Sequence, residues 1–456
     1  MRKLLLIFIF IVFNNINSYS QGTEDFNNSN ATSSYLDGSF VGNSSITWTY
    51  VHSRNGNGDN NGSGINLPAL MLRRSSSDSK ITSSTISGGI TDFTMKLYKG
   101  FTGSGNRQVE LFINGVSKGS STPFNNYNEQ NFSVSGINVS GDIVIEIRNI
   151  TSKQVIIDDI TWTAYSNDLI VSSDQTISSD LSYDNVTVNS GQTLTISKTG
   201  SLTVLGNLTN NGTVILNSDN DEYGSLIVQG TSSGNINYNR WINSISIGSP
   251  TSGDTGWDLV GSPVVGASLT SSNFSENSGN YAIQPYDNSD NTWTTTSSAS
   301  VSTSIGIGYA MAKQTAGTEA FTGTVETSDK NVNITNNDGS GSGTQWNLIA
   351  NPYPSYLALN SNARSASSAS TDFITQNAVT ADVLGSGTNE DAIWYWTGSG
   401  YGQYNNSSSA KYIAPGQGFF IASKTGGGTL KFLESMQTST GSDDFISGDI
   451  MEGNRG

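Results

Sequence analysis

The chain has 456 residues, and its 37 acidic and 21 basic side chains give it a formal net charge of −16. A surface with so few cations cannot release the counterions that drive binding to nucleic acid or anionic lipid, so both are excluded as partners. Cysteine is absent, which excludes disulfides, thiolate metal sites, cysteine nucleophiles and a lipidated N-terminal cysteine.

The first twenty residues have the order of a cleavable signal peptide. Two basic residues precede an apolar run from Leu4 to Phe13, and Ser18 and Ser20 provide small side chains before a cut at Gln21. The run is too short to cross a bilayer, and no later stretch approaches the ~18 apolar residues that a span needs. The sequence therefore predicts export to the extracellular space or the outer cell surface, with residues 1–20 removed and no membrane span.

Residues 21–166 are expected to form a β-sandwich of jelly-roll type. Short runs of alternating apolar and polar residues are separated by turn signals over this whole stretch. One of them, Val109 to Ile113, leads into Asn114-Gly115, the dipeptide favoured in tight hairpin turns. In the closing run, strict alternation places Ile156, Ile160 and Trp162 on one face.

Residues 167–243 contain a small repeat. Gly191, Gly200, Gly212 and Gly224 each precede a short β run, and the last three are spaced by twelve residues. A recurring turn glycine followed by an alternating strand is typical of a stacked β-coil. We expect a solenoid-like array of four rungs, one for each glycine.

Residues 244–344 and 345–440 are predicted to be two copies of one β domain. Four segments correspond in the same order: Gly256–Pro263 with Gln345–Pro352, Ala282–Tyr286 with Ala392–Trp396, Ile307–Met311 with Gln417–Ile421, and Gly317–Phe321 with Gly428–Phe432. Trp257 and Trp346, which open the duplicated strand, are interpreted as core anchors. Residues 337–343 are expected to be a flexible linker, the insertion 360–382 to hold short helices, and residues 441–456 to be a tail.

Several of these segments resemble multidomain cargo of type IX secretion, the adhesin-like secreted proteins of Bacteroidota. They are Gly105–Val116, Ile157–Trp162, Trp346–Pro354, Ala414–Phe420 and Glu434–Gln437. The resemblance implies a surface or secreted protein, often adhesin-like or appended to a hydrolase. Such proteins continue into a C-terminal sorting domain with a Tyr-Pro-Asn-Pro motif, and this sequence is expected to lack that domain.

No catalytic constellation is apparent. His52 is the single histidine, so a Ser-His-Asp system would depend on it. The stretch Gly230–Gly234 has the letters of a hydrolase nucleophile elbow, but a strand-like run follows it rather than a helix. Metalloprotease and phosphate-loop motifs are missing. A pair of carboxylates acting as a glycosidase is left open, because it needs only two acids at a suitable separation.

Aromatic side chains are the candidate ligand-binding residues. Alternation places Trp394 and Trp396 on one face of a strand and Tyr395 on the other, so the three cannot all be core. The predicted glycan platform consists of Trp394, Trp396, Tyr401 and Tyr404 in the second copy, with Tyr286 and Trp293 in the first.

Acidic turns are candidates for structural calcium; no other cofactor is expected. Asp219 and Asp221 form one turn, without the bidentate Glu of an EF-hand, and Asp287 and Asp290 form another. The alternative is that these are solvated turn residues. Asp158 points inward by alternation and would need a hydrogen bond or a cation there, unless a bulge turns it outward.

The predicted fold class is therefore all-β: an N-terminal jelly-roll sandwich, a short β-coil and two duplicated β domains. The expected function is a secreted or cell-surface, non-catalytic binding or adhesion protein, with glycans or cell-surface components as partners. Two alternatives stay open. One is a polysaccharide-degrading hydrolase or lyase that uses carboxylates, and the other is a structural stalk that spaces a C-terminal module.

Overall fold

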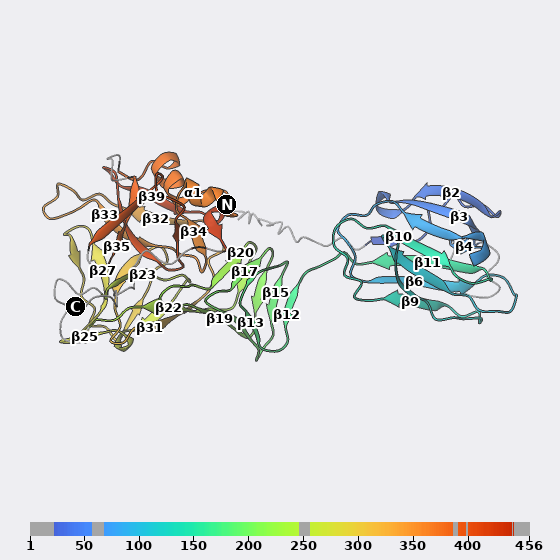
Figure 1. The fold of residues 1–456 in the computed structure, drawn as a ribbon, viewed down its shortest axis with the longest axis horizontal. Helices are drawn as coiled ribbons and strands as arrows, with labels where there is room; N and C mark the ends of the chain where they lie inside the picture. The colour runs from blue at the N-terminus through green and yellow to red at the C-terminus, as the bar shows by residue number, and fades with distance from the viewer. Residues whose placement is uncertain are drawn as a thin grey trace, which may run out of the picture. The chain divides into compact units, whose positions relative to one another are not determined.

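The computed structural model describes residues 22–56, 68–245, 256–385, 391–397, 400–439 and 441. The predicted signal peptide and almost all of the predicted tail lie outside these residues. The chain is all-β, as predicted, and it divides into two compact units, residues 1–166 and 167–456 (Figure 1). Among the described residues, no helix is long and apolar enough to cross a membrane.

The first unit is a β-sandwich with strand order β8-β7-β10-β5-β3-β4-β11-β6-β9, with β1 added on β11 and β2 on β3. The strands are β1 Gly22–Glu24, β2 Leu36–Val41, β3 Thr47–Asn55, β4 Leu70–Leu72, β5 Lys80–Ser83, β6 Phe93–Lys99, β7 Val109–Ile113, β8 Val116–Ser120, β9 Gln130–Val134, β10 Ile145–Asn149 and β11 Val155–Trp162. The long strand β3 joins the two halves, because residues 48–51 pair with β5 and residues 53–55 pair with β4. His52 lies between these stretches with φ 44°, so the only histidine sits at a bend of the strand.

The predicted face of Ile156 is wrong, because strand β11 contains a β-bulge. The register shifts between Asp158 and Thr161, and Asp159 has φ 46°. Ile160 and Trp162 therefore belong to the main sandwich core, whereas Ile156 packs in a separate cluster on the other face of the sheet. Strict alternation fails here because the extra residue of a bulge changes which face the following side chains point to.

The second unit begins with a three-sided parallel β-coil. Its strands are β12 Leu169–Val171, β13 Gln175–Ile177, β14 Asp180–Tyr183, β15 Val186–Val188, β16 Thr193–Ile196, β17 Ser201–Val204, β18 Leu208–Asn210, β19 Thr213–Asn217, β20 Ser225–Val228, β21 Ser232–Ser233 and β22 Ile236–Ile242. They form the sheets β12-β15-β18-β21, β13-β16-β19-β22 and β14-β17-β20, with leucine, valine and isoleucine side chains inside.

The expectation of one rung per glycine is wrong. Gly191 and Gly212 precede β16 and β19 of one sheet, while Gly200 and Gly224 precede β17 and β20 of another. Successive glycines therefore mark successive corners of the coil. The physical reason is close approach: a Cβ on Gly200 would lie 2.3 Å from the carbonyl oxygen of Ile177 in the preceding coil.

A ladder of side-chain hydrogen bonds keeps the coils in register. Asp168 Oδ1 accepts from the backbone N–H of Asn185, Asn185 Oδ1 from that of Asn207, and Asn207 Oδ1 from that of Thr231, each at 3.0 Å. Each side chain thus satisfies a backbone donor of the next coil, which would otherwise need water.

The two predicted copies contain four-stranded sheets of the same order, β23-β30-β27-β28 and β33-β38-β35-β36. The strands of the first copy are β23 Asp258–Gly261, β24 Ser268–Thr270, β25 Glu276–Asn277, β26 Asn280–Tyr281, β27 Ile283–Asp287, β28 Thr292–Trp293, β29 Ser300–Ser302, β30 Gly308–Met311 and β31 Gly317–Gly323. Those of the second are β32 Lys330–Ile334, β33 Trp346–Ala350, β34 Tyr356–Ala358, β35 Ala392–Trp396, β36 Tyr401–Asn405, β37 Tyr412–Ile413, β38 Gly418–Ala422, β39 Gly428–Phe432 and β40 Gln437–Thr438. The insertion holds helix α1 Ser361–Ser365 and a π-helical turn, Thr375–Thr380.

Strand pairing places the borders of the copies differently from the predicted limits 244–344 and 345–440. β22, predicted to end the coil, pairs antiparallel with β31 of the first copy. In the same way β32, predicted to belong to the first copy, pairs with β39 of the second. Each copy is thus a sheet inserted between two strands that pair with each other. The paired strands are far apart in the sequence, so their pairing could not be predicted from it.

The two copies meet through equivalent residues. A Cβ on Gly308 would lie 2.7 Å from the side chain of Leu348, and a Cβ on its counterpart Gly418 would lie 2.7 Å from the backbone of Leu259, the counterpart of Leu348. Isolated β-bridges show the same reciprocity, because Val260 pairs with Gln417 while their counterparts, Ile349 and Ile307, pair with each other. This reciprocity is that of a two-fold, isologous interface within one chain. Leu259, Ala310, Leu348 and Phe420 share one apolar cluster across it.

Candidate functional site

An aromatic hollow of about 310 Å³ lies where the two copies meet. It is lined by Tyr286, Asn291 and Trp293 of the first copy and by Trp346, Trp394, Tyr401 and Phe420 of the second. No lining residue is charged. Such a concave, mostly aromatic surface with few polar groups is typical of a small-molecule or sugar site.

Two aromatic cross-strand pairs form the rim of the aromatic hollow. Tyr286 is opposite Trp293 in the hairpin β27–β28, and their rings meet edge to face with centroids 5.2 Å apart. The equivalent pair in β35–β36, Trp396 and Tyr401, has the same separation. Trp293 and Tyr401 are 36% and 51% exposed, so both present ring surface to solvent.

Phe420 packs beneath rings from both copies. Its ring centroid lies 5.0 Å from that of Tyr286, 5.7 Å from that of Tyr401 and 6.1 Å from that of Trp293. Phe420 itself is buried. One core side chain therefore positions the exposed rings of two hairpins.

Trp346 is not the core anchor that the sequence indicated. It is half-buried, lines the aromatic hollow and packs edge to face on Trp394 with centroids 5.6 Å apart. Trp257, its counterpart, is also half-buried and lines a smaller hollow of about 180 Å³. Alternation correctly predicts that Trp346 shares a face with the buried Leu348, but it does not reveal that the covered part of that face ends before Trp346.

Polar groups in the aromatic hollow are neutral. The hydroxyl of Tyr286 donates to Asn291 Oδ1 at 2.7 Å, which leaves the Asn291 amide group as a donor. Burial raises the pKa of Tyr286 and that of Tyr401, so both phenols stay protonated at physiological pH.

The turn that carries Asn291 is held against the second copy. Asn288 Nδ2 donates to the carbonyl oxygen of Thr335 at 3.0 Å, and the Asn288 carbonyl accepts from the N–H of Thr344 at 2.9 Å. Asn337 Nδ2 donates to Asn288 Oδ1 at 2.9 Å. The stretch predicted to be a flexible linker is therefore a hydrogen-bonded loop, and it fixes one wall of the aromatic hollow.

Four of the six predicted glycan residues line the aromatic hollow: Tyr286, Trp293, Trp394 and Tyr401. Trp396 contacts Tyr401 and belongs to the same apolar cluster without being part of the lining. Tyr404 lies elsewhere, because its ring stacks on Tyr395 with centroids 4.6 Å apart. Both side chains alternate to the opposite face of their strands, which is the physical reason that Tyr404 is separated from the others.

Sequence reasoning missed Trp346, Phe420 and Asn291. The comparison of the copies carries a signal for Phe420, because the equivalent residue of the first copy is the small Ala310. Asn291 has φ 60°, a conformation that asparagine tolerates better than most residues, so the Asp-Asn turn gave a weak signal for it.

The predicted calcium turns are occupied by protein contacts. Asp219 pairs with Lys198 and accepts the backbone N–H groups of Asp221 and Glu222. In the other turn Asp287 accepts from the N–H of Ser289, and Asp290 accepts from the hydroxyl of Thr292. Over the part of the chain that the structure describes, no three acidic or histidine side chains are grouped to hold a metal ion.

Asp158 is buried, and the bulge turns its neighbour Asp159 outward. Asp158 is 3% exposed, and its Oδ1 accepts from the N–H of Asp159 at 2.8 Å. Asp159 instead reaches Lys96, with 2.8 Å between its Oδ2 and the lysine Nζ. Burial raises the pKa of Asp158 to about 7.

The stretch Gly230–Gly234 does not have the local structure of a nucleophile elbow. Ser232–Ser233 is strand β21, parallel to β18 in the coil, and not the strand-to-helix turn of a nucleophile elbow. His52 belongs to the other compact unit. The lining of the aromatic hollow contains no carboxylate.

Fold and site together define a modular all-β protein with an internal duplication and an aromatic hollow at the junction of the copies. Residues 126–450 match the family described as "Domain of unknown function (DUF8693)", and the chain belongs to that family. No curated protein matches the chain.

Solved structures similar to parts of the chain include carbohydrate-binding modules. The CBM36-1 domain of a multidomain xylanase from the hindgut metagenome of Trinervitermes trinervoides is 15% identical, with coverage of 32% of this chain and 98% of that one, and a TM-score of 0.23. A CBM36 in complex with calcium and xylotriose is 18% identical, with 22% and 84% coverage and a TM-score of 0.18. A family 6 carbohydrate-binding module is 13% identical, with 32% and 95% coverage and a TM-score of 0.20.

Proposed function

We propose that this chain is an exported, non-catalytic carbohydrate-binding protein, and that the aromatic hollow is its sugar-binding site. The observation that carries the proposal is the convergence of Trp293, Trp346, Trp394 and Tyr401 from two domain copies around one open hollow. Export is supported by the basic, apolar and small-residue order of residues 1–20.

Sugar rings suit this lining because their two faces differ in polarity from their edges. The C–H groups of a pyranose face can pack on an indole or phenol ring and remove apolar surface from water. The hydroxyls at the ring edge can then reach the amide of Asn291 and the phenol of Tyr401. Since the lining carries no charge, it favours an uncharged sugar over a uronic acid or a sulfated one.

A binding role is favoured over hydrolysis by the residue types that line the aromatic hollow. A glycosidase needs two carboxyl groups on either side of the scissile bond, roughly 5–10 Å apart. The aromatic hollow provides rings and one amide, but none of the residues lining it is an acid. The geometry therefore supports holding a sugar rather than cleaving it.

The test compares two tyrosines of the same strand, β36. Tyr401→Ala removes an exposed ring from the aromatic hollow, whereas Tyr404→Ala removes a ring that stacks on Tyr395 outside it. On a glycan array followed by titration, we expect Tyr401→Ala and Trp394→Ala to weaken binding about tenfold or more, as is usual for an aromatic anchor. Tyr404→Ala should bind like the parent chain.

Two results would refute the proposal. One is the absence of binding to every glycan on the array by the parent chain. The other is binding that Tyr401→Ala and Trp394→Ala leave unchanged, with both variants shown to be folded by thermal unfolding.

A further inference from the structure

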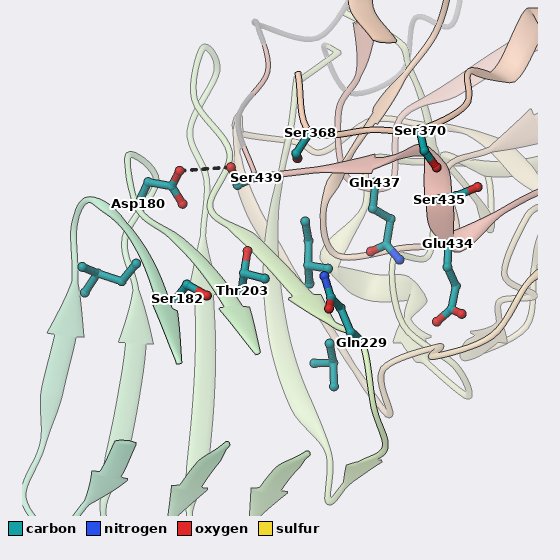
Figure 2. A pocket seen from close by; sticks show the side chains of 13 residues that line it. Asp180, Ser182, Thr203, Gln229, Ser368, Ser370, Glu434, Ser435, Gln437 and Ser439 are labelled. Carbon is teal, nitrogen blue, oxygen red and sulfur yellow. Dashed lines mark hydrogen bonds between the residues drawn. The ribbon is translucent and has the colours of Figure 1, made fainter. Parts of the chain in front are cut away.

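A second hollow, the polar groove, lies within the second unit and has a volume of about 590 Å³. The coil contributes one wall, with Asp180, Ser182, Thr203 and Gln229, and the second copy contributes the other, with Glu434 and Gln437 (Figure 2). It shares no lining residue with the aromatic hollow. Its chemistry also differs, because its lining is rich in hydroxyl and amide groups and contains no aromatic ring.

The coil wall of the polar groove repeats with the coil. Ser182 of β14 is the register partner of Thr203 of β17, which is in turn the partner of Ile227 of β20. Neighbouring strands are roughly 4.8 Å apart. Side chains along this wall therefore recur at an interval close to the length of one sugar ring in an extended chain.

The opposite wall presents an unused donor. Gln437 is 8% exposed, and its Oε1 accepts from the hydroxyl of Ser355 at 2.7 Å. Its Nε2 has no hydrogen-bond partner among the described residues, and Figure 2 shows the side chain directed into the polar groove across from Gln229. A buried amide held by its oxygen, with its nitrogen open to a groove, is oriented to bind an acceptor from outside.

The charge of the polar groove selects against anions. Asp180 and Glu434 are the ionisable residues of its lining, which contains no lysine, arginine or histidine. Asp180 already accepts from Ser201 and from Ser439. Burial, with Asp329 and Glu326 nearby, raises the pKa of Glu434. An anionic ligand would meet these carboxyl groups without a compensating cation.

We propose that the polar groove binds an extended, uncharged polysaccharide chain through its hydroxyl groups, as a second site separate from the aromatic hollow. Hydroxyls both donate and accept, so one chain can satisfy the Gln437 amide, the Gln229 amide and the serine and threonine hydroxyls of the two walls. The proposal goes beyond the sugar site at the aromatic hollow and does not depend on it.

The experiment uses the full chain with the aromatic hollow disabled by Trp394→Ala. Native gels containing laminarin, arabinoxylan or galactomannan, with polygalacturonate as the anionic probe, report binding as retardation. We expect at least one neutral polymer to retard this variant and polygalacturonate not to retard it. Adding Thr203→Trp, which fills the polar groove, should weaken retention at least fivefold, and adding Gln229→Ala should weaken it about threefold.

Thr195→Trp is the matched control. Thr195 is half-buried in β16 of another coil sheet, like Thr203 in its own sheet, and it lines neither hollow. If Thr195→Trp weakens retention as much as Thr203→Trp, the effect is one of folding and the proposal is wrong. Retention that neither groove variant changes, or retention of polygalacturonate as strong as that of the neutral polymers, also overturns it. So does the loss of all retention in Trp394→Ala alone, which would leave the aromatic hollow as the sugar site.

Discussion

Phe420, which lines the aromatic hollow, stands where the first copy has the small Ala310. Phe420 fills the space beneath Tyr286 and Tyr401 and holds both rings at the surface. In the first copy the methyl group of Ala310 cannot support rings in this way. Trp394 of the hollow likewise stands where the first copy has Gln284, so the duplicated domains differ at two positions that form the aromatic hollow, and each difference adds the large contact area of an aromatic ring.

Asp158 gives a prediction about pH. Its pKa is about 7 in the folded chain, against about 3.9 for a free aspartate, because burial disfavours the charged form. Asp159 and Asp25 add repulsion, and Lys96 opposes it only in part. Between pH 4 and 7 the Asp158 carboxyl is therefore more protonated in the folded chain than in the unfolded one, and its contribution to the free energy of unfolding falls as the pH rises through this window.

Asp158→Asn should remove this pH dependence. The amide oxygen can still accept from the N–H of Asp159, and no charge is buried at high pH. We expect the D158N variant to be more stable than the parent at pH 8 by about 1–4 kcal/mol, with the difference disappearing near pH 4. Urea unfolding of both chains in chelator measures it, and a D158N variant that is less stable at pH 8 would contradict the assignment. Repeating the pH 8 measurement with calcium tests the predicted metal role, since a cation at Asp158 would stabilise the parent alone.

At the scale of the element, alternation predicted the strand faces except across the bulge of β11, and the repeated segments predicted the duplication, but neither predicted the partners of strands. The Trp-x-Leu runs of β23 and β33 revealed the repeat because both strands keep the same alternation. The pairing of β32 with β39 was not visible, since sequence alternation does not say which distant strand a strand will join. For the same reason the spacing of the turn glycines predicted one rung for each glycine, whereas each glycine marks a corner between two sheets. Most of the aromatic residues of the site could be predicted from the sequence. The way in which they come together could not, because it depends on the interface between the two copies.

The asparagine ladder of the coil gives a prediction at this scale. Asn207 Oδ1 accepts from both the N–H and the hydroxyl of Thr231, so Asn207→Ala leaves a backbone donor of the next coil without its partner. We expect a loss of about 1–2 kcal/mol in the free energy of unfolding of the second unit. Asn211→Ala is the control, because Asn211 is exposed in the same coil and its side chain makes no hydrogen bond among the described residues; it should change stability by less than about 0.5 kcal/mol. Equal losses in the two variants, measured by urea unfolding, would show that the ladder does not hold the coils together.

For the whole molecule, the family match and the compact units have different borders. The match begins at residue 126, within the sandwich, whereas the first unit extends to Ser166. The matched part of the sandwich contains β9, β10 and β11. Of these, β10 lies between β7 and β5, and β11 lies between β4 and β6, so both are internal strands whose partners precede residue 126.

This difference predicts how fragments of the chain behave. A fragment of residues 126–456 would carry β10 and β11 without their neighbours, leaving unpaired strand edges and the exposed side chains of Ile145, Ile147 and Ile157. We expect limited proteolysis to remove residues 126–166 from it and the fragment to aggregate. A fragment of residues 167–456 keeps every strand pair of the second unit and all residues of the aromatic hollow. It should resist the protease and bind the same glycans as the full chain to within about twofold. Rapid degradation of this shorter fragment, or protection of residues 126–166 in the longer one, would show that the two units do not fold as the strand pairing indicates.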